Sequence, residues 1–240
     1  MKALGNTLAI GTSFVATSST GVNFLITNRH NVTGRHHETG ELLCTKTGAV
    51  PDSLSVWHNA SSGLGQFVPV EVPLFNEDEP IWIEHPVLGE KADFVALPIT
   101  TNPEIILYPY KPSYHSHMHI EPAQTVSVIG FPFGERTGAS FAVWATGFIA
   151  SEPEINHGGR PIFLIDCRSR PGQSGSPVIL YHNGGGLLTH EDGSEVISPV
   201  SWLLGIYSGR INKESDLGIV WKTEVVAELI DYASTSVNEF

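Results

Sequence analysis

The stretch Arg170-Pro171-Gly172-Gln173-Ser174-Gly175-Ser176-Pro177 places a serine in a turn rich in glycine and proline. Far upstream, a histidine closes the apolar run Leu25-Ile26-Thr27-Asn28-Arg29-His30. Between these two segments an aspartate opens a second apolar run, Ala92-Asp93-Phe94-Val95-Ala96-Leu97. The chain therefore carries a histidine, an aspartate and a serine in that order, each at the edge of an expected strand or turn.

These three residue types have complementary chemistry. A serine hydroxyl is a weak nucleophile unless a base removes its proton during attack. Histidine can take that proton and return it, because its pKa lies near neutrality. A buried carboxylate on the other imidazole nitrogen fixes the tautomer and stabilises the imidazolium ion. Jointly, the order and the local sequence predict a catalytic triad of His30, Asp93 and Ser174. Three residues rival this set but lack its local context: Ser176, Asp52 and Asp78.

The order histidine, aspartate, serine is that of the chymotrypsin arrangement and differs from the subtilisin and α/β-hydrolase orders. With its three motifs, the chain resembles the trypsin-like serine peptidases. The resemblance implies an all-β fold of two chymotrypsin-like antiparallel β-barrels followed by a C-terminal α-helix. It makes Ser174 the nucleophile, His30 the general base and acid, and Asp93 the orienting carboxylate. It also implies an oxyanion hole formed by the backbone N–H groups of Gly172 and Ser174.

Within this family the nearer likeness is to bacterial enzymes. Residues 128–134 and 146–149 are similar to the high-temperature-requirement proteases, and residues 173–178 and 204–209 to the glutamyl endopeptidases. Gln173 stands where animal trypsins carry an aspartate that pairs with their freed N-terminus. Because Gln173 offers no charge for such a pair, we expect that this chain needs no proteolytic activation.

The resemblance places the primary specificity pocket between the segment before Ser174 and the strand that begins near Tyr207. The candidate substrate-binding residues there are Arg168, Arg170, Tyr207, Ser208, Gly209 and Arg210. Guanidinium groups match carboxylates, so the three arginines predict cleavage after Glu or Asp, unless they pair with the protein's own carboxylates. A small or aliphatic preference is the alternative, because glutamyl endopeptidases carry a histidine where Tyr207 stands. The resemblance also implies a hydrogen bond from Ser208 to Asp93.

The domain organisation follows from the same pattern. We expect one peptidase domain over residues 1–240, with an N-terminal barrel at about 8–105, a connection at 106–122 and a C-terminal barrel at 123–222. The 24 glycines and 16 prolines separate short apolar runs, as is typical of strands and turns. We expect a hairpin from 11–17 and 22–27, and further strands at 54–57, 67–72 and 81–83. A single helix is expected at 223–233, with Thr223 as its cap.

The composition limits the kinds of partner that the chain is expected to bind. A net charge of −12 argues against nucleic acid and membrane surfaces, since both favour basic faces. We therefore expect a protein or peptide substrate, no cofactor and no metal ion; the histidines at 115–119 fit a solvated linker better than a metal site. No signal peptide is visible, and the chain has only two cysteines, Cys44 and Cys167. Few cysteines favour a reducing compartment, so we expect a cytoplasmic protein, with a secreted form lacking its leader as the alternative. The sequence does not predict an oligomeric state.

The competing function class is a catalytically silent module of the same fold that binds extended peptides by β-strand addition. The sequence argues against it, because all three triad residues are present. Hydrolysis of activated esters would use the same machinery.

Overall fold

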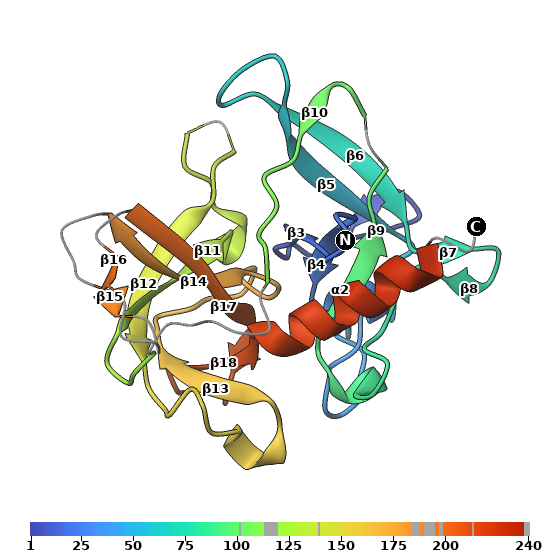
Figure 1. The fold of residues 1–240 in the computed structure, drawn as a ribbon. Coiled ribbons are helices and arrows are strands. Elements are labelled where there is room, and N and C mark those ends of the chain that lie inside the picture. The colour runs from blue at the N-terminus through green and yellow to red at the C-terminus, as the bar shows by residue number, and fades with distance from the viewer. Residues whose placement is uncertain are drawn as a thin grey trace.

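The computed structural model describes residues 1–100, 102–112, 120–138, 140–183, 188–189, 195–196, 199–212 and 214–237. Over these residues the chain is mostly β, and a long helix closes it at the C-terminal end (Figure 1). The all-β fold class and the C-terminal helix are confirmed. The histidine-rich run 115–119 lies outside the described residues.

The N-terminal half contains two larger antiparallel sheets and one small sheet of two strands. Its elements are β1 (Lys2–Ala3), β2 (Asn6–Thr7), β3 (Phe14–Thr17), β4 (Asn23–Thr27), α1 (Arg29–Thr33), β5 (Ser53–Ala60), β6 (Phe67–Pro73), β7 (Phe75–Asn76), β8 (Glu79–Pro80), η1 (Gly89–Lys91), β9 (Val95–Pro98) and β10 (Ile105–Ile106). One larger sheet has the order β3-β4-β9; in the other, β5 pairs with β1, β6 and β10, and β1 pairs with β2. The expected hairpin is therefore present as β3 and β4, although β3 begins only at Phe14.

The register of β4 against β9 brings two distant segments together. Thr27, at the end of β4, pairs with Val95, at the start of β9. His30 lies three residues beyond Thr27, and Asp93 lies two residues before Val95, so both emerge at the same edge of this sheet. This strand pairing explains why His30 lies close to Asp93, which the sequence alone could only suggest.

Two expectations for local structure were wrong. The segment 81–83 forms only an isolated bridge, from Ile83 to Ala96, because the chain turns at His85 and Pro86 instead of extending the pairing. The second error concerns helices: α1 was not expected, since five residues are too few to show a helical period.

The C-terminal half is a closed barrel with the strand order β11-β12-β13-β18-β17-β14. Its elements are β11 (Thr125–Gly130), η2 (Pro132–Gly134), β12 (Val143–Ile149), η3 (His157–Gly159), β13 (Ile162–Asp166), β14 (Pro177–Asn183), β15 (Leu188–Thr189), β16 (Glu195–Val196), β17 (Pro199–Arg210) and β18 (Leu217–Lys222). Pro177 at the start of β14 pairs with Ile206 of β17. The pairing continues into the preceding turn, where Gly175 N–H donates to the Tyr207 carbonyl at 2.9 Å. The serine turn is thus attached to β17.

The C-terminal helix α2 (Thr223–Val237) runs from the barrel toward the N-terminal half (Figure 1). Its buried face joins a core cluster that includes Ile26 and Phe94 of the N-terminal half and Trp221 of β18. The helix contributes Val225, Val226, Leu229, Ile230 and Ala233 to that cluster. Burying each of the larger side chains contributes about 1.5–3 kcal/mol, so α2 joins the two halves around a shared core.

The expected cap of this helix was wrong. Thr223 is itself the first helical residue, and its hydroxyl is buried without a hydrogen-bond partner, so its side chain caps no backbone amide. Elsewhere, Cys44 and Cys167 are both free thiols. Among the described helices, none is both long enough and apolar enough to cross a membrane.

Candidate active site

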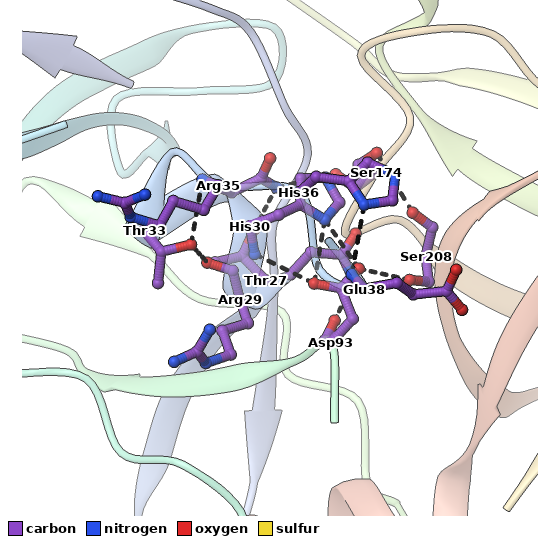
Figure 2. Close-up of polar contacts among 12 residues, drawn as sticks. Thr27, Arg29, His30, Thr33, Arg35, His36, Glu38, Asp93, Ser174 and Ser208 are labelled. Atoms are coloured by element: carbon purple, nitrogen blue, oxygen red, sulfur yellow. Dashed lines mark hydrogen bonds and ion pairs between the residues drawn. The ribbon is translucent and has the colours of Figure 1, made fainter. Parts of the chain in front are cut away.

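His30 and Asp93 form a close pair where β4 and β9 meet (Figure 2). His30 Nδ1 lies 2.8 Å from Asp93 Oδ2 and 3.0 Å from Oδ1, and the His30 backbone N–H donates to Oδ1 at 3.1 Å. Asn28, the residue before α1, donates from its side-chain amide to the Asp93 carbonyl at 2.5 Å. Asp93 is therefore held in place through both its carboxylate and its backbone carbonyl.

The charge of Asp93 is stabilised although the residue is 1% exposed. Burial, the largest influence, disfavours the charged form, but the charge of His30 and hydrogen bonds from His30 and Ser208 outweigh it, and the pKa of Asp93 is lowered. Ser208 Oγ donates to Asp93 Oδ2 at 2.5 Å. An ionised Asp93 requires a proton on His30 Nδ1, which leaves the other ring nitrogen, Nε2, free to act as a base.

A β-bulge explains how Ser208 reaches Asp93. The register of β17 against β18 shifts between Tyr207 and Gly209, so Ser208 is the extra residue on its strand. A bulge redirects a side chain that regular pairing would aim elsewhere, and such bulges are over-represented beside active sites. The hydrogen bond that the resemblance implied thus has a local cause in the strand.

Ser174 lies next to Ser208, in the turn that precedes β14 (Figure 2). It is partly exposed, and its hydroxyl donates to the Ser208 carbonyl at 3.5 Å. The structure shows no hydrogen bond between Ser174 Oγ and His30. Catalytic hydrogen bonds are often long in substrate-free enzymes and tighten when substrate binds.

The rival residues are less well placed. Ser176 is fully buried, and its hydroxyl has no hydrogen-bond partner. Asp52 accepts a hydrogen bond from the Leu4 N–H at 2.6 Å, and Asp78 is exposed in the β7–β8 turn. Among these carboxylates, the one that contacts His30 is Asp93.

The turn before Ser174 leaves two backbone N–H groups without an acceptor among the described residues, those of Gly172 and Ser174. The carbonyl of Pro171 accepts a hydrogen bond from Phe133 N–H at 2.6 Å. A trans peptide directs its N–H opposite to its carbonyl, and the described chain contains no cis peptide bond. The Gly172 N–H therefore points away from Phe133.

Two glycines are required by this turn. Gly172 has φ = +97° and Gly175 has φ = +90°, a region that favours glycine. A Cβ at position 172 would lie 2.3 Å from the Phe131 carbonyl oxygen, and one at position 175 would lie 2.1 Å from that of Thr12. The Gly-x-Ser-Gly spacing therefore reflects both backbone conformation and close packing of the turn.

The three candidate arginines have different surroundings. Arg170 is half-buried, and its guanidinium donates to the Ser169 carbonyl at 2.7 Å and to Asp216 at 3.3 Å. Arg168 is exposed and Arg210 is half-buried. Within the described residues, neither of these two makes a recorded hydrogen bond or ion pair, so only Arg170 pairs with one of the protein's own carboxylates there.

Tyr207 is buried in the core of the C-terminal barrel. Its hydroxyl forms a short hydrogen bond with the buried Ser169 hydroxyl, and its ring packs so closely on Gly218 that a Cβ there would lie 2.6 Å from it. Burial, the main influence, raises the pKa of Tyr207 to about 12. The phenol is therefore neutral and fills space between the two segments assigned to the specificity pocket.

Sequence reasoning missed three polar residues that hold the serine turn. Thr12 N–H donates to the Ser174 carbonyl at 2.9 Å, and Asn31 Nδ2 donates to the same oxygen at 3.2 Å. Thr27 Oγ1 in turn donates to the Thr12 carbonyl at 2.8 Å. No residue type in these positions signals such contacts, because Thr12 and Asn31 are both more than 140 positions from Ser174 in the chain.

The segment after α1 borders the same site. His37 packs edge-on against Trp221 with ring centroids 6.3 Å apart, and burial is the main cause of its lowered pKa. The guanidinium of Arg160 forms an ion pair with the carboxylate of Glu38, with 3.2 Å between nitrogen and oxygen, and this links the segment to the C-terminal half. Beside it lies a hollow of about 560 Å³ lined by polar groups of residues 33–40 and by Phe75 and Trp82.

The two halves, the serine turn and the shared helix define a serine peptidase of the chymotrypsin fold. The chain belongs to the trypsin-like peptidase family, whose domain matches residues 11–185. It is accordingly a trypsin-like peptidase, a hydrolase.

Solved structures agree on the fold. A thermostable serine protease, AL20, from an extremophilic microorganism shares 13% identity, with a TM-score of 0.52 over 94% of this chain and 90% of that one. A serine endoprotease from Yersinia pestis shares 16% identity, with a TM-score of 0.51 over 96% of this chain and 59% of that one. No curated protein matches the sequence. The more particular likeness to glutamyl endopeptidases stays a prediction.

Proposed function

We propose that this peptidase is a serine endopeptidase that works through an acyl-enzyme on Ser174, with His30 as general base and acid and Asp93 as the orienting carboxylate. The observation that carries the proposal is the pair formed by the buried Asp93 and the half-buried His30, together with a serine turn that has two N–H groups without an acceptor among the described residues. Ser174 Oγ attacks the peptide carbonyl carbon while its proton passes to His30 Nε2. The carbonyl oxygen, now an oxyanion, is bound by the N–H groups of Gly172 and Ser174.

The second half of the reaction reverses these roles. The C–N bond breaks as His30 returns the proton to the leaving amine, and the acyl group remains on Ser174. Water then attacks the ester carbonyl carbon and gives its proton to His30, which passes a proton to Ser174 Oγ as the ester C–O bond breaks and the acid is released. Removing one oxyanion donor typically costs about 10²–10³ in rate, and proton transfer by a positioned base contributes about 10²–10⁴.

Peptide hydrolysis by matched serine variants tests this proposal. Ser174→Ala removes the proposed nucleophile, whereas Ser176→Ala removes a buried hydroxyl two residues away that has no hydrogen-bond partner. We expect Ser174→Ala to lose at least about 10³-fold in kcat/KM and Ser176→Ala to retain activity. Full activity in Ser174→Ala, measured on a mixed peptide library, would contradict the proposal.

We further propose a preference for acidic residues before the scissile bond, with Arg168 and Arg210 as the residues that bind the carboxylate. Both guanidinium groups lie in the expected segments and lack a recorded carboxylate partner within the described residues, in a chain of net charge −12. Arg170 is a weaker candidate, because it already pairs with Asp216. Charge-assisted hydrogen bonds of this kind contribute about 1.5–3 kcal/mol, or roughly 10- to 150-fold in specificity.

One observation favours the alternative of a small or aliphatic preference. The Tyr207 ring fills space between the two segments, which would shorten any pocket there. Peptides that differ only in Glu, Gln or Ala before the scissile bond separate the two. A Glu-to-Gln ratio above about 10 that falls in Arg168→Gln or Arg210→Gln supports the acidic preference; faster cleavage of the Ala peptide supports the alternative.

A further inference from the structure

We propose that Thr12 is a positioning residue of the oxyanion turn, a role that rests on the proposed function. Thr12 precedes β3 in the N-terminal half and is 4% exposed. Its hydroxyl donates to the Gly172 carbonyl at 2.8 Å and accepts a hydrogen bond from Phe131 N–H at 3.3 Å. One side chain thus links the N-terminal half to two segments of the C-terminal half.

The contact matters because Gly172 connects two peptide groups: the preceding one carries the Gly172 N–H of the proposed oxyanion hole, and the following one leads on toward Ser174. The preceding peptide is held through its Pro171 carbonyl by the Phe133 N–H, a backbone bond available to any sequence. The following peptide is held at both ends, since the Thr12 hydroxyl donates to its Gly172 carbonyl and its Gln173 N–H donates to the Arg170 carbonyl at 3.2 Å. Glycine restricts its own φ and ψ very little, so the direction of these peptides depends on what holds their polar groups, and Thr12 supplies the one side-chain hydroxyl among them.

Thr12 is itself fixed from several sides. Its N–H donates to the Ser174 carbonyl, and its own carbonyl accepts from Thr27 Oγ1. Its hydroxyl fits only because position 130 is glycine, where a Cβ would lie 2.7 Å from Thr12 Oγ1. Two polar groups of Thr12, its N–H and its hydroxyl, therefore bond one turn while its carbonyl is held by Thr27, and its hydroxyl has little freedom to choose another partner.

Loss of the hydroxyl should act mainly on the transition state. The oxyanion forms only as the carbonyl is attacked, so a misdirected Gly172 N–H lowers kcat while substrate binding is nearly unchanged. We expect kcat to fall about 10- to 100-fold in Thr12→Val, part of the 10²–10³ that an oxyanion donor contributes. A residue that only supported the fold would instead change thermal stability, with kcat of the folded fraction preserved.

The experiment compares Thr12→Val and Thr12→Ala with Thr12→Ser, which keeps the hydroxyl. Ser127→Ala serves as the control, since it removes a buried hydroxyl bonded to Thr146 at 3.3 Å in the same barrel. The readouts are kcat and KM on one peptide, and the inhibition constant of the matching peptide aldehyde, whose hemiacetal oxyanion needs the hole. Thermal melting identifies variants that fail to fold. If the valine side chain does not fit at position 12 and Thr12→Val is unfolded, the smaller Thr12→Ala variant tests the proposal in its place.

The proposal predicts that Thr12→Val and Thr12→Ala lose kcat and aldehyde affinity together with KM nearly constant, while Thr12→Ser retains most turnover. Equal kcat in Thr12→Ala and wild type, or an equal loss in Thr12→Ser, overturns it. If wild type itself hydrolyses nothing, the proposed function fails separately. Hydrogen exchange of residues 172–176 then tests Thr12: faster exchange in Thr12→Ala than in Ser127→Ala supports its hold on the turn, and equal exchange overturns it.

Discussion

The hydrogen bond from Ser208 to Asp93 should have a measurable and charge-dependent free energy. Ser208→Ala removes one of the groups that stabilise a carboxylate that is 1% exposed. Hydrogen bonds to charged groups contribute about 1.5–3 kcal/mol, and charge-assisted bonds are about twice as strong as neutral ones. We expect Ser208→Ala to lower the free energy of unfolding at pH 7 by about 1.5–3 kcal/mol.

The pH dependence of this loss follows from the lowered pKa of Asp93. A carboxyl group whose pKa is lower in the folded state adds stability above its unfolded pKa, about 3.9. That stability is lost as the pH falls through the folded pKa. The difference between wild type and Ser208→Ala should therefore be constant from pH 7 to about pH 5 and shrink below about pH 4.

A double-mutant cycle with Asp93→Asn isolates the charged part of the interaction. Urea unfolding of wild type, both single variants and the double variant at pH 7 should give a coupling of about 1–2 kcal/mol. The same cycle near pH 3.5 should give a smaller value, because the carboxyl group is then increasingly protonated. A coupling below about 0.5 kcal/mol at pH 7, or one that does not change with pH, would refute this reasoning.

Three further predictions concern the fold. His85 is 2% exposed, and burial is the main influence that lowers its pKa. Because the unfolded state therefore binds a proton more readily than the folded state, the free energy of unfolding should fall from pH 7 to pH 5.5. Urea unfolding should show a less steep fall in His85→Gln. Identical slopes would contradict this. Gly175→Ala should lower Tm by about 4–8 °C, because φ is +90° and the new Cβ would lie 2.1 Å from the Thr12 carbonyl oxygen; an unchanged Tm would show that the turn relaxes. Because both cysteines are free, dithiothreitol should leave Tm unchanged.

The residues of the candidate site were predictable where local sequence and chain order carried the information. His30 follows one strand and Asp93 precedes another, and pairing of those strands brings the two residues together. The serine turn was evident from its glycines, since their spacing reflects a backbone that few residues adopt. These features depend on neighbours in sequence, which is why a single sequence contains them.

The remaining features depend on side-chain direction across the two halves. The Thr12 hydroxyl reaches a carbonyl 160 positions away, and the bulge that redirects Ser208 arises from a register shift between β17 and β18. The pairing of Arg170 with Asp216 and the burial of Tyr207 were equally invisible. Periodicity predicts which strands form but leaves such partners unspecified.

The most direct test of the account is labelling of the purified protein with a fluorophosphonate, read by intact mass. An activated Ser174 should give a single adduct that is absent in Ser174→Ala and retained in Ser176→Ala. Labelling that persists in Ser174→Ala would contradict the assignment of the nucleophile. Absence of any adduct on folded wild-type protein would contradict an assembled catalytic site and favour a peptide-binding module instead.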